Sequence, residues 1–250
     1  MICKLCNKDL PLRKSHIIPE FFYRPGYDEK GRLFAMYEGI LKDRYIQKGI
    51  REELLCGGCE QFLNDNYEKY FYSFWYKKQN MPSKADGNVY WVRGIEYGQF
   101  KLFLLSILWR AGVAKGKDYA SVSLGPHEKI IRNMILKKDP GPETKYQIFA
   151  VLLLLPGTKD ICSGFIMPPI ASHIDARHLY VFAFGGCVWN FVVSSHPFGV
   201  PVDGFALSDK GTMLMPTIDL TDFPPVDKFM KSQIKAFKIA ASKSQWGHSI

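Results

Sequence analysis

The sequence predicts an α+β protein in which a cysteine-bearing N-terminal region, residues 1–80, precedes a more apolar α+β domain, residues 89–250, with a mostly antiparallel sheet. Three observations predict this class: apolar residues at helical spacing, continuous apolar runs of strand length, and a two-glycine hairpin signal. The turn-rich residues 81–88 mark the expected boundary. Apolar residues make up 47% of the chain and charged residues 23%, which excludes disorder along its whole length.

Apolar periodicity and run length place the individual elements. The predicted helices are Cys59–Lys77, Gln99–Val113, Pro126–Leu136 and Asp227–Lys243. The predicted strands are Lys14–Pro19, Gln147–Leu155, Leu179–Phe184, Cys187–Val193 and Gly211–Pro216, with loops and short strands over residues 24–48. Gly185-Gly186 separates two of these strands and fits a two-residue hairpin turn.

The lengths of the apolar segments indicate the cellular compartment of the protein. Met1 is followed almost at once by Cys3, with no apolar segment of the length that a signal peptide needs. The runs Leu102–Trp109 and Ile148–Pro156 are far shorter than the roughly 20 residues of a membrane span. We therefore expect a cytoplasmic protein without membrane contact, where paired cysteines are more often metal ligands than disulfides.

Two C-x2-C pairs, Cys3 with Cys6 and Cys56 with Cys59, flank residues 7–55. Zinc prefers four tetrahedral ligands, and thiolates suit it. A first pair in a tight turn and a second pair at the start of a helix form the layout of a treble-clef zinc finger. The sequence therefore predicts one structural Zn²⁺. The alternative, four unrelated buried cysteines, requires two such pairs to arise by accident.

Cys162 and Cys187 lie on apolar segments of the second region. Free cysteines often behave as small buried hydrophobes. We therefore expect neither residue to have a catalytic role.

Residues 3–72 contain two further motifs beside the cysteine pairs. One is Lys14-Ser15-His16-Ile17-Ile18-Pro19, and the other is Leu54-Leu55-Cys56-x-x-Cys59-Glu60. Together they resemble the HNH (ββα-metal) nuclease family, and most closely bacterial HNH-like proteins of unassigned function. The resemblance implies metal-dependent hydrolysis of phosphodiester bonds in DNA or RNA, with a catalytic Mg²⁺ or Mn²⁺ beside the structural zinc and with His16 as the general base.

The chain departs from the HNH pattern around the expected catalytic metal. Ser15 stands where an acidic residue is frequent, Glu52 and Glu53 lie where an Asn is common, and Glu60 follows the last cysteine. Substitute oxygen ligands are available on the predicted helix, because Glu60, Asn64 and Glu68 follow each other at four-residue spacing and project from one face. The alternative is a solvated polar face, with His16 hydrogen-bonded inside the finger.

The net charge of +9 favours a polyanionic partner, DNA more than RNA. Lysines at 228, 231, 235 and 238 form a basic stripe on the last predicted helix, which suits either solvent or phosphates. Three hypotheses follow: an HNH-like nuclease, a non-catalytic zinc finger that binds nucleic acid, and an interaction or sensor protein whose residues 89–250 bind a protein partner or a small ligand.

Overall fold

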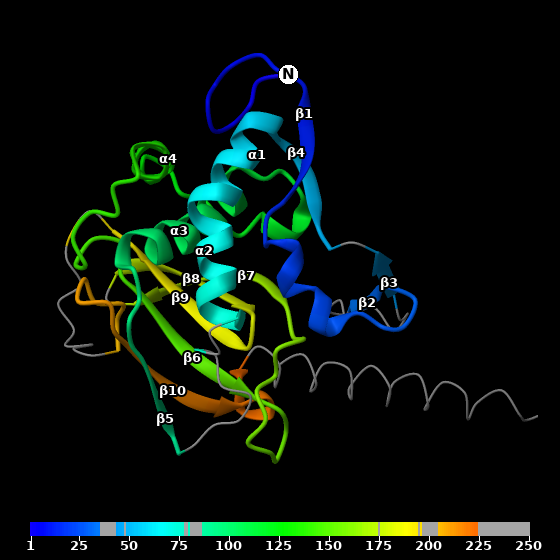
Figure 1. Ribbon diagram of the computed structural model, residues 1–250, viewed down its shortest axis with the longest axis vertical. Helices are drawn as coiled ribbons and strands as arrows, with labels where there is room; N and C mark the ends of the chain where they lie inside the picture. The colour runs from blue at the N-terminus through cyan, green and yellow to red at the C-terminus, as the bar shows by residue number, and fades with distance from the viewer. Residues whose placement is uncertain are drawn as a thin grey trace, which may run out of the picture.

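The computed structural model confirms the α+β class (Figure 1). It describes residues 1–35, 44–47, 49–77, 80, 87–174, 176–194, 196 and 205–224. The predicted helix Asp227–Lys243 and its lysine stripe lie outside the described residues.

The N-terminal region is built on an antiparallel hairpin of β1 (Leu12–His16) and β4 (Arg51–Cys56). The predicted strand Lys14–Pro19 is correct only to His16, because the chain then turns through buried Ile17 and Ile18 toward two short 3₁₀ helices, Glu20–Phe22 and Arg24–Gly26. The short strands β2 (Arg32–Ala35) and β3 (Arg44–Gln47) pair with each other, as expected for residues 24–48.

The predicted helix Cys59–Lys77 is confirmed and begins two residues earlier. It consists of α1 (Gly57–Leu63), a π-helical stretch (Asn64–Glu68), α2 (Lys69–Tyr72) and a second π-helical stretch (Ser73–Lys77). We call the whole element the first helix.

Six strands form a curled sheet in the order β5-β10-β6-β9-β8-β7. Their bounds are β5 Val89–Val92, β6 Ile148–Leu154, β7 Met167–Ile174, β8 Arg177–Phe184, β9 Cys187–Val193 and β10 Met213–Asp219. The sheet is mixed, because β10 runs parallel to β6 while the other neighbours are antiparallel. Strand β7 was not predicted; it is an edge strand whose register shifts at Pro168 and Pro169, where no N–H is available for pairing.

The predicted hairpin at Gly185-Gly186 is present between β8 and β9. Phe184 pairs with Cys187, and both glycines have positive φ, 61° and 79°, as a type I′ turn requires. Gly185 also allows Phe22 to approach the turn closely, because an added Cβ would lie 2.5 Å from the ring of Phe22. The hairpin tip is therefore packed directly against the N-terminal region.

The first helix and α3 (Tyr97–Val113) contact the sheet through aromatic side chains. Helix α3 is buried over most of its length, and α4 (His127–Lys137) packs against it. Trp75 of the first helix and Phe100 of α3 both contact Trp189 of β9, with ring centroids 5.6 and 6.1 Å apart. Buried apolar residues on both sides of residues 81–88 consequently form one continuous core, from Cys3 to Met215.

None of the helices in the described part of the chain combines the length and apolar composition that a membrane crossing requires.

We expect Gly185→Ala to lower the free energy of unfolding more than Gly157→Ala. The two glycines have similar φ, 61° and 65°, so both variants incur a left-handed strain of about 1–2 kcal/mol. Only Gly185 faces Phe22, whereas a Cβ at Gly157 meets no atom within 4 Å. The collision should add about 1–3 kcal/mol. Urea denaturation of both variants measures the difference, and equal losses would contradict the close contact.

Candidate metal centre

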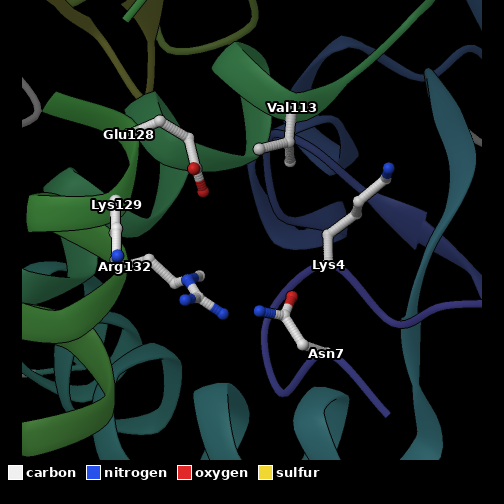
Figure 2. A pocket seen from close by; sticks show the side chains of 6 residues that line it. All are labelled: Lys4, Asn7, Val113, Glu128, Lys129 and Arg132. Atoms are coloured by element: carbon white, nitrogen blue, oxygen red, sulfur yellow. The ribbon is translucent and has the colours of Figure 1, made fainter. Parts of the chain in front are cut away.

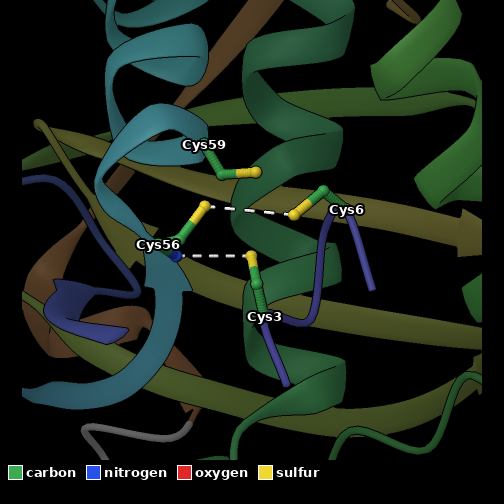
Figure 3. Close-up of side chains that lie close together, drawn as sticks. All are labelled: Cys3, Cys6, Cys56 and Cys59. Carbon is green, nitrogen blue, oxygen red and sulfur yellow. Dashed lines mark hydrogen bonds between the residues drawn. The ribbon is translucent and has the colours of Figure 1, made fainter. Parts of the chain in front are cut away.

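Four cysteine side chains from distant parts of the sequence converge at the N-terminal hairpin. Figure 3 shows the sulfurs of Cys3, Cys6, Cys56 and Cys59 facing one another. Their Sγ atoms all lie within 4.8 Å of one another, and those of Cys6 and Cys56 are 3.9 Å apart. Among the described residues, this is the one group of three or more His, Cys, Asp or Glu side chains close enough to share a metal ion.

The backbone holds each pair in place. Cys3 and Cys6 sit on a tight turn closed by the N–H of Asn7, which donates to the carbonyl of Cys3 (2.9 Å), with Asn7 in the left-handed conformation. Cys56 is the last residue of β4 and Cys59 lies in the first turn of α1. The N–H of Cys56 donates to Sγ of Cys3 (3.3 Å), which links the two pairs.

The distances and charges of this group fit zinc. Tetrahedral geometry with Zn–S bonds of about 2.3 Å places two sulfurs about 3.8 Å apart, close to the separation of Cys6 and Cys56. Burial would raise the pKa of Cys3, but N–H donors of Cys6, Cys56 and Leu5 outweigh it and lower that pKa to about 7.

The pKa of Cys59 is raised, first by burial and then by the neighbouring thiols. The Cys59 thiol thus favours its protonated form, and a bound cation would offset the repulsion among four thiolates. The four sulfurs together could hold a metal ion such as Zn²⁺.

Cys162 and Cys187 are buried, as expected, and lie outside the four-cysteine group. Burial raises the pKa of both thiols, which keeps them protonated and unreactive.

His16 lies at the end of β1, where its ring contacts a carboxylate. Its Nε2 is 2.7 Å from Oε2 of Glu20, and its side chain is 22% exposed. The hydroxyl of Tyr27 donates to the other oxygen of Glu20 (2.8 Å). Glu20 was not among the predicted site residues, although its position four residues after His16 could have drawn attention to it.

Arg110 joins the His16 strand to the first helix. This side chain of α3 is only 2% exposed, and its NH1 donates to the carbonyl of His16 (2.9 Å) and to Oε1 of Glu68 (3.0 Å). Its Nε donates to the carbonyl of Ser106 and its NH2 to the hydroxyl of Ser106, both at 3.3 Å. Glu68, expected as a ligand of a catalytic cation, is thus the partner of a buried guanidinium. The overlooked signal in the sequence was a charged residue at the end of the apolar run Leu102–Trp109.

The other two predicted ligands on the first helix are Glu60, in the α-helical part, and Asn64, the first residue of the π-helical stretch. Glu60 has a buried Oε1 that accepts no hydrogen bond within the described part of the chain. Asn64 is half-buried and begins the π-helical stretch that ends at Glu68. A π-helical turn contains more residues than an α-helical turn. Asn64 and Glu68, four residues apart, therefore do not share one face in the way that an α-helix would place them.

Two departures from the HNH pattern have structural roles here. Ser15 is buried, and its hydroxyl accepts the N–H of Leu55 (3.2 Å) beside the register shift between β1 and β4. The carboxylate of Glu52 accepts the N–H groups of Lys115 (2.7 Å) and Gly116 (2.8 Å), which ties β4 to the segment after α3. Both side chains hold the hairpin in position.

No protein-family model, curated protein or solved structure matches the chain. The likeness to HNH nucleases therefore depends on the motifs within residues 3–72.

We expect about one zinc ion per purified chain, because four thiolates form a closed site. Cys56→Ser should reduce the zinc content and the melting temperature, since structural zinc binding contributes roughly 10 kcal/mol or more. Elemental analysis and thermal unfolding measure the two effects. The matched control is Cys187→Ala, which should keep the metal. Less than about half a zinc per untreated chain would contradict the site.

We expect Arg110→Met to lower the free energy of unfolding by roughly 3–5 kcal/mol, because it leaves the carboxylate of Glu68 and the carbonyl of His16 without their donor. Lys69→Met is the control: Lys69 pairs with Asp65 on the solvent side of the same helix, and its loss should have little effect. Denaturant titration compares the two. Similar small losses would show that Arg110 does not stabilise this junction.

Proposed function

We propose that the protein is a non-catalytic, zinc-stabilised nucleic-acid-binding protein of the cytoplasm, with DNA the preferred partner. Its four cysteines would hold Zn²⁺ in a treble-clef arrangement. The turn of Cys3 and Cys6, the β1–β4 hairpin, and the helix that carries Cys59 occur in the order that such a finger requires. The net charge of +9 supports a polyanionic partner.

The position of Arg110 favours binding over cleavage. In the HNH interpretation, a divalent cation lies between the His16 strand and the acidic residues of the first helix. Here a guanidinium lies between the carbonyl of His16 and the carboxylate of Glu68. Two unit charges of like sign 4 Å apart repel by about 4 kcal/mol at an effective dielectric of 20, and a divalent ion doubles this. A catalytic cation that uses Glu68 must therefore displace Arg110 or overcome this repulsion.

A metal-dependent nuclease is the second candidate, and one observation favours it. The ring of His16 is partly exposed and lies 2.7 Å from the carboxylate of Glu20. A carboxylate next to a histidine stabilises the imidazolium that forms when the histidine accepts a proton. Glu20 could thus serve His16 in the orienting role that an Asn has in the HNH pattern.

We expect the wild-type protein to bind labelled DNA, more weakly as salt rises, and to leave DNA and RNA intact with Mg²⁺ or Mn²⁺. Anisotropy measures binding and gel electrophoresis measures cleavage. His16→Ala should bind like the wild type and retain its zinc.

Cleavage that depends on His16 would support the nuclease hypothesis instead. If the wild type cleaves either nucleic acid and His16→Ala loses about 10²–10⁴-fold in rate with its zinc retained, the nuclease hypothesis replaces the proposed one. His173→Ala, an exposed histidine of β7, is the control and should then cleave normally. A wild type that neither binds nor cleaves would favour a protein or small-ligand partner.

A further inference from the structure

A polar cleft of about 490 Å³ lies between the turn of the metal centre and helix α4 (Figure 2). Lys4 and Asn7 of the turn form one wall, α4 forms the other, and Val113 at the end of α3 lies between them. Arg132 of α4 and Asn7 extend toward one another across the cleft. The residues of α4 that line it are Glu128, Lys129 and Arg132.

The cations of this cleft have no acidic partner among the described residues. Lys4, Lys129 and Arg132 contribute three positive charges against the single negative charge of Glu128, and none of the three forms an ion pair with a described carboxylate. Oε1 of Glu128 accepts the indole N–H of Trp109 (2.7 Å), which holds this carboxylate on the Trp109 side of the cleft, where it offsets one of the three positive charges. The lining thus carries an excess of two positive charges, which attracts an anionic ligand.

The side chains of the cleft select the chemistry of that ligand. Lysine and arginine only donate hydrogen bonds, and the amide of Asn7 adds further donors. Among the described residues, Val113 is the one apolar member of the lining, and none of them offers an aromatic ring on which a base could stack. Phosphate oxygens, which only accept, suit the donors of the two lysines, Arg132 and Asn7, whereas a base finds no face to stack on.

One of the cations is held in place by the metal-binding turn. NH1 of Arg132 donates to the carbonyl of Leu5 (3.2 Å), a residue between the first two cysteines. Lys4 is fixed at its backbone, where its N–H donates to the carbonyl of Leu54 (3.0 Å). The shape of the cleft consequently depends on the fold of the turn that carries Cys3 and Cys6.

We propose that this cleft binds the phosphodiester backbone of a nucleic acid, independently of base sequence, and that zinc supports binding by organising one wall. This proposal rests on the proposed function and adds the surface through which it acts.

The test compares two double variants that each remove two positive charges from the full-length, zinc-loaded chain. Lys4→Gln with Lys129→Gln alters the cleft without touching the bond between Arg132 and Leu5. Lys159→Gln with Lys210→Gln removes two exposed lysines from turns elsewhere. Anisotropy of a labelled 20-base-pair duplex of arbitrary sequence, measured over a KCl series, gives affinity and its salt dependence for each protein.

We expect the cleft variant to bind roughly 10-fold more weakly or worse, with a log–log salt slope shallower by about 1.8, or 0.9 for each lost phosphate contact. The control variant should stay within about twofold of the wild type, because charges beyond roughly 10 Å are screened at 0.1 M salt. Unchanged zinc content and melting temperature in both variants show that the fold is retained.

Three results would overturn the proposal, and they separate it from the proposed function. If the wild type binds but both variants weaken equally, the cleft is not the site while nucleic-acid binding stands. If poly-glutamate displaces the duplex at equal charge concentration, the cleft recognises anions without preferring phosphodiesters. If the wild type binds no duplex at roughly 10⁻⁵ M, within the usual range of non-specific affinity, the proposed function itself fails.

Discussion

The first helix fixes the four-cysteine group to the rest of the molecule, and this is the constraint on which the other features depend. Its first turn carries Cys59, and its later turns bury Phe71 and Trp75 against α3 and β9. A shift of the helix would therefore move Cys59 within the four-cysteine group and disturb the aromatic core at the same time. Because the core is close-packed, it resists such a shift. The cysteine group is thus positioned by contacts far outside the N-terminal region.

Polar contacts complete this junction at its buried points. The hydroxyl of Tyr67 on the first helix donates to the carbonyl of Ile135 on α4 (2.6 Å), while Arg110 bonds both Glu68 and the His16 strand. A buried guanidinium is costly unless its donors are satisfied, and here all of its nitrogens have acceptors. The satisfied arrangement specifies one orientation of β1 relative to α3. It explains how the charge of Arg110 is accommodated in the buried part of α3.

The sequence predicted those features whose cause is local. Cysteine spacing identified the four sulfurs, two glycines identified the β8–β9 hairpin, and aromatic periodicity identified the first helix. It did not reveal β5 or the edge strand β7, whose pairing depends on distant partners, nor the parallel β10–β6 contact. The partners of His16 and Glu68 also escaped prediction. Glu20 is close in sequence but its role depends on the turn after β1, and Arg110 lies 42 residues after Glu68.

These contacts also show that residues outside a sequence motif affect the chemistry of the residues within it. The backbone places His16 at the end of a strand, β1, and Cys59 at the start of a helix, α1. The chemistry depends on what occupies the space between them. In this chain the guanidinium of Arg110, from helix α3 outside residues 3–72, bonds both the carbonyl of His16 and the carboxylate of Glu68.

Helix α3 also packs against α4, which carries two cations, Lys129 and Arg132, of the cleft beside the turn of Cys3 and Cys6. Residues after position 89 thus add positive charge at two places near the cysteine group. At Glu68 the charge is buried and paired, whereas at the cleft it has no partner among the described carboxylates. The buried charge of Arg110 stabilises the fold. The proposed phosphate contact depends instead on the charges that line the cleft.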